Sequence, residues 1–228
     1  MKMKSKNMTF MLYLTAVFGM FYMVVSGTAV AETITGSAHD FSSRTYTGGQ
    51  ICVTCHTPHG SNTDVTDAPL WNHTLTTQTY TLYSSDTLNA TVGDPSGASK
   101  LCLSCHDGSV AVDSFGGTKS AGNTETLIGS RAVGADGLNN DHPISFVYNK
   151  ALADADGALF DPATKTVTIG SGAKQKTGTI AAVLLPGGTL ECSSCHDVHN
   201  TFTYAQTGSR LLRISDAGSK ICLSCHDK

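Results

Sequence analysis

All eight cysteines of this chain fall into one five-residue pattern, C-x-x-C-H, which occurs four times. This pattern is typical of covalent c-type haem attachment. The two thiols form thioether bonds to the two vinyl groups of one porphyrin, and the histidine that follows binds the iron from the proximal side. The cysteine pairs are Cys52 and Cys55, Cys102 and Cys105, Cys192 and Cys195, and Cys222 and Cys225.

Two other uses of C-x-x-C pairs compete with haem attachment. Two such pairs can share one zinc ion, and single pairs can form redox-active or structural disulfides. Neither use explains why a histidine follows the second cysteine in all four copies. We therefore predict four haem c groups with the proximal iron ligands His56, His106, His196 and His226.

Five further histidines are candidates for the distal side of the irons. All six methionines lie between positions 1 and 23, so methionine ligation is excluded from the mature chain. Histidine on both sides gives a six-coordinate, low-spin haem, which suits electron transfer and leaves no open site for a substrate. Five candidates for four positions leave one spare, which the sequence does not identify. The candidates are His39, His59, His73, His142 and His199.

An internal repeat orders the motifs into two dihaem units. Residues 99–107 match residues 219–227 at all but one position, and the first and third motifs each carry a second histidine three residues after the first. These second histidines, His59 and His199, are too close to their own proximal ligand to bind the same iron, so we expect them to bind a neighbouring haem. The two units are predicted to span about residues 36–110 and 140–228.

The sequence between the motifs has little helical periodicity, and its richness in Gly, Ser, Thr, Asp and Asn is typical of loops. We expect short helices at the haem motifs and a small β-hairpin region, with strands at 158–160 and 165–169 joined by a turn at Asp161-Pro162. Further strand candidates are 79–82 and 179–185. The predicted fold class is mostly irregular coil, a multihaem cytochrome c fold organised around four stacked haems that form the core.

The N-terminus predicts export. Lys2, Lys4 and Lys6 precede an apolar run that ends near the small-residue site Ala29-Val30-Ala31, so we predict a signal peptide at 1–31 and a mature tetrahaem domain at 32–228. An uncleaved anchor is the alternative. The formal net charge is −3 even before the three lysines are removed, which disfavours a nucleic-acid partner. We expect no lipid anchor and no membrane span in the mature chain.

Six segments together resemble the extracellular tetrahaem cytochromes of metal-reducing bacteria that polymerise into nanowires. The resemblance covers most of residues 36–228 and implies bis-histidine haems, a continuous haem chain through a filament, and one histidine that binds a haem of the neighbouring subunit. We expect His39, on a short polar arm of the mature chain, to be that histidine, with His73 as the next candidate. The segments are 37–42, 52–59, 69–73, 101–108, 142–145 and 192–200.

Three classes of function fit four haems on an exported chain. The first is extracellular electron transfer through a homopolymeric, head-to-tail filament, with other electron-transfer cytochromes and extracellular acceptors as partners. The second is a soluble periplasmic electron carrier. The third is a multihaem reductase, which needs an iron with a free or weakly held site. The number of histidines argues against such a site, so we expect no enzyme activity.

Overall fold

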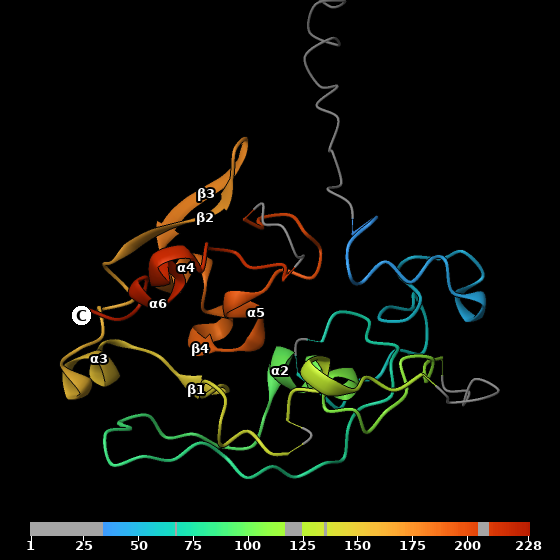
Figure 1. Ribbon diagram of the computed structural model, residues 1–228, viewed down its shortest axis with the longest axis horizontal. Coiled ribbons are helices and arrows are strands. Elements are labelled where there is room, and N and C mark those ends of the chain that lie inside the picture. Colours follow the sequence, from blue (N-terminus) through green and yellow to red (C-terminus); the bar gives the residue numbers. More distant parts are fainter. Residues whose placement is uncertain (1–33, 67, 117–124, 135, 205–209) are drawn as a thin grey trace, which may run out of the picture. The chain divides into compact units, whose positions relative to one another are not determined.

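The computed structural model of the chain describes residues 34–66, 68–116, 125–134, 136–204 and 210–228 (Figure 1). The predicted signal peptide lies outside these ranges. The described residues belong to a single unit with the bounds Thr33–Lys228. Within the described ranges, no helix is both long and apolar enough to cross a membrane.

Short helices mark three of the four motifs. α2 (Gly97–His106) contains the second motif, α5 (Cys192–Cys195) the third, and α6 (Lys220–Leu223) the start of the fourth. The first motif forms an isolated turn. The other helices are α3 (Lys150–Asp156), α4 (Ile180–Val183) and the 3-10 turns η1 (Thr45–Thr47), η2 (Gly129–Arg131), η3 (Pro186–Gly188) and η4 (Ala217–Ser219). Most of the remaining described chain is turn and coil, as predicted.

The β-hairpin lies further along the chain than the sequence suggested. β2 (Thr166–Ser171) pairs antiparallel with β3 (Lys174–Thr179), and the loop between them begins at Gly172, whose φ is +59°. Two-residue hairpin loops need a positive φ at this position, which glycine adopts without strain. The predicted strand at 158–160 does not pair with 165–169, because Leu159 forms a β-bridge with His226 instead.

Two further strand predictions were wrong for local reasons. Residues 180–183 form α4 because the Thr179 side chain caps this helix, accepting a hydrogen bond from the N–H of Ala182 at 3.3 Å. Residues 79–82 are coil apart from one β-bridge between Leu82 and Leu138. Alternating polar and apolar residues alone therefore did not produce a strand here.

The second half of the chain has a conventional hydrophobic core, so the expectation that haems alone form the core was wrong for this part. The hairpin, α3 and α4 contribute to it, as does the antiparallel pair β1 (Phe146–Val147) and β4 (Thr189–Leu190) (Figure 1). Ile169 and Ile180 are its most buried members, at 1% and 0% exposure. The core residues are Phe146, Tyr148, Leu152, Ala153, Val167, Ile169, Ile180, Val183, Leu184, Leu185 and Leu190.

Candidate haem sites

The C-x-x-C-H motifs share a single helical turn. The backbone N–H of the motif histidine donates to the carbonyl of the first cysteine, at 2.8 Å in the first motif, 3.0 Å in the third and 2.9 Å in the fourth. The second motif lies within α2. Residues three apart on a helical turn lie on the same face. Each pair of thiols is therefore placed as two attachment points on one porphyrin require.

Two short segments pair antiparallel with the first and third motifs through single β-bridges. We call them the first strap (residues 69–72) and the second strap (residues 210–213). The third residue of each strap, Trp71 or Leu212, forms a β-bridge with the motif histidine. The residue after it donates its N–H to the carbonyl of the motif's second cysteine, at 2.9 Å in both copies. The straps are thus equivalent parts of the two repeats, although they share only one leucine.

That shared leucine has the same unusual backbone conformation in both straps. Leu70 and Leu211 adopt φ angles of 52° and 54°, in the left-handed region that costs a non-glycine residue about 1 kcal/mol or more. The turn presents the carbonyl of the preceding residue to the motif histidine. The Pro69 and Arg210 carbonyls each accept from the histidine Nδ1 at 2.7 Å. This pair of turns carries no glycine or other local sequence signal from which it could be predicted.

Besides His73, four of the predicted iron ligands have Nδ1 fixed by a backbone carbonyl. A neutral imidazole has one N–H, so a donating Nδ1 leaves Nε2 with a free lone pair. Histidines that bind metals commonly donate their other ring N–H in this way. The pairs are His56 with Pro69, His106 with Arg131, His142 with Pro143 and His196 with Arg210, at 2.7, 2.8, 2.8 and 2.7 Å.

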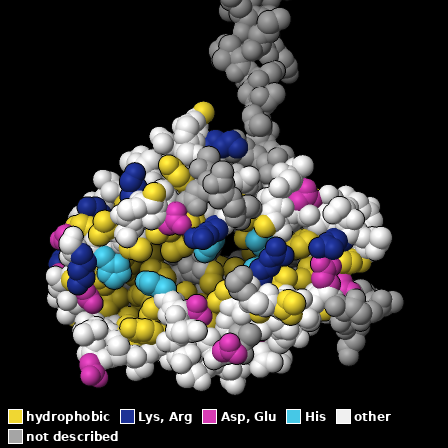
Figure 2. All heavy atoms as spheres, in the orientation of Figure 1, with side chains coloured by type: hydrophobic (Ala, Val, Ile, Leu, Met, Phe, Trp, Pro, Cys, Tyr) yellow, Lys and Arg dark blue, Asp and Glu magenta, His cyan; other side chains and the backbone are white. Residues whose placement is uncertain are grey.

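Three predicted distal histidines lie opposite a proximal histidine. The ring centres are 6.0 Å apart for His39 and His106, 6.1 Å for His56 and His199, and 6.4 Å for His142 and His226. Figure 2 shows histidine side chains along a hollow that is lined by hydrophobic side chains. The structure therefore brings together three proximal and three distal candidates from distant parts of the sequence.

His39 folds back onto its own chain. Its arm is held by turns, in which the N–H of Asp40 donates to the Ser37 carbonyl and the N–H of Gly36 donates to the Asp40 carboxylate. Burial is the main cause that lowers the pKa of His39 to about 4, and His106 adds to it. His39 is thus neutral at pH 7. This placement is the alternative to the expected contact with a neighbouring subunit.

His73 differs from the other candidates because both of its ring nitrogens meet protein groups. It is 1% exposed, Nδ1 lies 2.8 Å from the Thr74 carbonyl, and Nε2 lies 3.0 Å from the Ala111 carbonyl. Nε2 also lies 3.4 Å from Sγ of Cys105. Burial lowers the pKa of His73. Both ring nitrogens of His73 therefore face backbone carbonyl oxygens.

Burial favours the thiol over the thiolate at several of the cysteines, whereas the contact with Cys102 lowers the pKa of Cys192. Burial is the main cause that raises the pKa of Cys55 to about 11 and that of Cys225 to about 12. Zinc binds the thiolate, so such burial disfavours a zinc site. All eight cysteines are free, and none pairs as a disulfide. These environments are more consistent with thiols that become thioethers.

Buried polar atoms without a partner gather at the motifs, which fits a bound group that supplies the missing contacts. Among the described residues, Thr54 Oγ1, Ser193 Oγ, Trp71 Nε1 and His39 Nδ1 are buried and have no hydrogen-bond partner. Thr54 and Ser193 lie inside the first and third motifs, and Trp71 lies against His56. Haem carries polar propionates and an iron on an apolar plate, so it fits this donor set.

Glu191 joins the second and third motifs and was missed by the sequence analysis. It is 4% exposed, and its carboxylate accepts from the N–H of Ser99 at 3.2 Å, from the Ser99 hydroxyl, and from the Ser145 hydroxyl at 3.1 Å. The Ser99 hydroxyl also lies 3.0 Å from the N–H of Cys192, which donates to it. Glu191 therefore ties α2 to α5, and the interaction between the Cys102 and Cys192 thiols raises the pKa of Cys102 and lowers that of Cys192.

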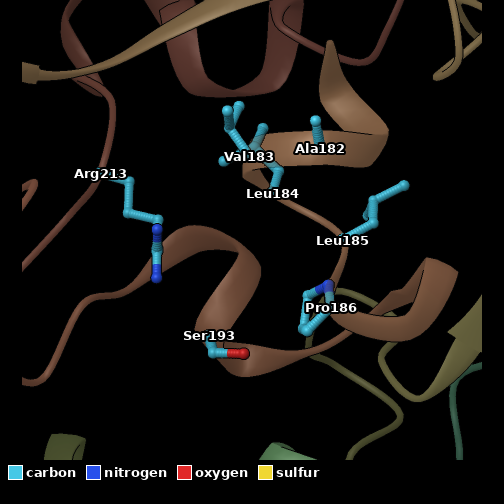
Figure 3. A pocket seen from close by; sticks show the side chains of 7 residues that line it. All are labelled: Ala182, Val183, Leu184, Leu185, Pro186, Ser193 and Arg213. Atoms are coloured by element: carbon cyan, nitrogen blue, oxygen red, sulfur yellow. The ribbon is translucent and has the colours of Figure 1, made fainter. Parts of the chain in front are cut away.

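A small hollow of about 180 Å³ adjoins the third motif (Figure 3). Val183, Leu184 and Pro186 line one side, and Arg213 extends toward Ser193 on the other. The Nε of Arg213 donates to the His196 carbonyl at 3.4 Å. An apolar wall with one guanidinium suits the edge of a porphyrin and a propionate.

Comparison with protein families supports this chemistry for the C-terminal part of the chain. A family model described as the doubled CXXCH motif matches residues 186–228, which contain the third and fourth motifs. No curated protein matches the chain. The match indicates a multihaem c-type cytochrome that binds haem covalently and transfers electrons.

Proposed function

We propose that this chain is an exported tetrahaem cytochrome that transfers electrons outside the cytoplasm and polymerises into conductive filaments. The observation that carries the haem chemistry is the set of four C-x-x-C-H turns, with Nδ1 of His56, His106 and His196 held by backbone carbonyls. The residues that hold the haems are the eight cysteines, the four proximal histidines and distal histidines from the remaining five.

When bound, haem supplies an iron that accepts and releases single electrons. Backbone carbonyls fix the tautomers of His56, His106 and His196, and burial lowers the pKa of His39 and His226. Two histidines on an iron leave no position for a substrate, so we propose a carrier and no catalytic site.

Polymerisation is supported by the resemblance of the six segments to filament-forming cytochromes. The contact of His39 with His106 in its own chain leaves the filament joint without an assigned histidine. His73, the other candidate for the joint, is buried. The same contacts favour a second candidate function, a soluble periplasmic tetrahaem carrier. They place both histidines against groups of their own chain, so neither is directed at a neighbouring subunit.

Negative-stain microscopy of the secreted fraction separates the two candidates. The filament proposal predicts filaments outside the cell that contain this chain as their main protein and that carry haem. Haem protein found only as monomers in the periplasmic fraction would support the soluble carrier instead. A high-spin ferric band in the wild-type optical spectrum would point to an open iron and therefore to the reductase.

A further inference from the structure

The spacing of the histidine rings carries information beyond the identity of the cofactor. A metal–imidazole bond of about 2 Å on each side of a shared metal places the two ring centres about 6 Å apart. The three observed separations lie between 6.0 and 6.4 Å. The rings are thus as far apart as two imidazoles that bind one metal from opposite sides.

The membership of the pairs supports the same interpretation. Each of the three pairs joins one motif histidine to one histidine outside the C-x-x-C-H pattern, as an axial pair requires. In two of the pairs the motif histidine, His56 or His106, donates from Nδ1 to a backbone carbonyl. In the third pair the distal histidine, His142, makes this contact. These histidines therefore present Nε2, and this follows from backbone contacts that are independent of the ring distances.

His73 differs from these histidines in its ring contact and in the surroundings of Nε2, although its Nδ1 also lies 2.8 Å from a backbone carbonyl. Its nearest ring centre is that of Trp71 at 6.3 Å, and both of its nitrogens lie within hydrogen-bond distance of backbone carbonyls. Binding to iron would require Nε2 to leave the Ala111 carbonyl in a site that is 1% exposed.

We propose that the axial pairs are His56 with His199, His106 with His39, and His226 with His142, and that His73 is the spare histidine with a structural role. This inference rests on the proposed haem chemistry and deepens it. By elimination, His59 binds the iron of the third motif opposite His196. The first and third motifs then exchange their second histidines, because His199 follows the third motif as His59 follows the first.

This assignment links segments that are far apart in the sequence. The haem attached at the first motif is held at His199 in the other repeat, and the haem at the third motif is held at His59. The two dihaem repeats are therefore not independent units. Each of the two exchanged haems acts as a crosslink between them, similar in kind to a disulfide across a long loop.

A spin-state test with paired variants decides which iron each distal histidine binds. His199→Ala should turn one haem in four high-spin. We then remove the first haem by Cys52→Ala and Cys55→Ala, or the third by Cys192→Ala and Cys195→Ala, in the same background. The proposal predicts that the high-spin signal disappears only when the first haem is removed. Disappearance only on removal of the third haem would overturn the pairing.

The conservative variant His199→Met covers the case in which these variants do not fold. It should keep all four haems low-spin and raise the reduction potential of one of them, since methionine–histidine ligation raises the potential. For His73, the variants His73→Gln and His73→Ala should both retain four low-spin haems. A high-spin haem in His73→Gln, with four haems still attached by mass, would restore His73 to the ligand set.

These outcomes are separate from failure of the proposed function. A wild-type chain with four attached haems but the wrong partner for His199 would overturn the pairing and leave the electron-transfer proposal intact. A wild-type chain without covalent haem would overturn both. A density map of the exported protein gives the same decision without any variant, since it shows the imidazole on each side of each iron.

Discussion

His73 shows how one residue type serves two purposes in this chain. Its imidazole is buried between the Thr74 and Ala111 carbonyls next to Cys105. The rings of His39, His142 and His199 instead each face a motif histidine. A neutral ring can donate to only one of the two carbonyls at a time. The site nevertheless disfavours protonation, because burial is the largest effect on its pKa.

The lowered pKa of His73 gives a pH dependence with a defined sign. In the unfolded chain the histidine pKa is about 6.5, so the unfolded state binds a proton that the folded state resists. The free energy of unfolding should therefore fall as pH drops from about 7.5 to 5.5. His73→Gln should flatten this dependence in part, since His39 and His226 also have pKa values lowered by burial. Denaturant midpoints across this range measure it, and an unchanged slope in the variant would contradict the burial argument.

The straps are elements whose role is visible only in the folded chain. Each holds a leucine in the left-handed region so that the preceding carbonyl reaches Nδ1 of the motif histidine. Leu70 is 54% exposed, whereas Leu211 is 9% exposed. The two positions therefore have the same backbone strain but different side-chain burial, which makes them a matched pair.

Asparagine at these two positions should separate strain from burial. Asn enters the left-handed region more readily than leucine. Leu70→Asn should stabilise the protein by about 0.5 kcal/mol, because little side-chain burial is lost. Leu211→Asn should destabilise it by about 2 kcal/mol through lost burial. Chemical unfolding of both variants gives the comparison, and a loss at Leu70 as large as at Leu211 would rule out the strain account.

Glu191 connects two helices, and its removal should destabilise their contact. Glu191→Ala leaves the Ser99 and Ser145 donors without an acceptor, which should cost about 3 kcal/mol. Glu191→Gln retains one acceptor oxygen and should cost about 1 kcal/mol. Urea unfolding followed by the haem absorption gives both values. Equal stability of the two variants would mean that the carboxylate does not clamp α2 to α5.

The sequence predicted the parts of this molecule that depend on short spacing. The C-x-x-C-H turns and the mostly coil character follow from residues within a few positions of each other. The hairpin was predicted at the wrong place because Asp161-Pro162 is a strong local turn signal. In the structure, Leu159 instead forms an isolated β-bridge with His226. Glu191, the straps and the ring pairs could not be predicted, because each depends on contacts between residues that are distant in the chain.

At the scale of the whole molecule, the two halves differ in what stabilises them. The hydrophobic core lies between Phe146 and Leu190, in the second half. In the first half, buried hydrophobic residues such as Trp71, Leu103 and Val112 are fewer and lie beside the motifs. The first half should therefore depend more on haem for its folding than the second half does.

Hydrogen exchange on chain produced without haem attachment tests this difference. The amides of β2 and α4 should keep measurable protection, because Ile169 and Ile180 pack in a core that requires no haem. The amides of residues 34–116 should exchange at the rates of an unfolded chain. Protection in the first half equal to that of the haem-loaded protein would show that its fold does not need the cofactor.

The central claim of this account is that all four C-x-x-C-H turns carry haem. The most direct test is the intact mass of the exported protein under denaturing conditions, which keeps thioether-linked haem on the chain. The account predicts the polypeptide mass plus four haems of about 0.6 kDa each. A fully matured protein with three or fewer haems, or with a mass two hydrogens lower for each cysteine pair, would contradict it, since the latter indicates disulfides in place of thioethers.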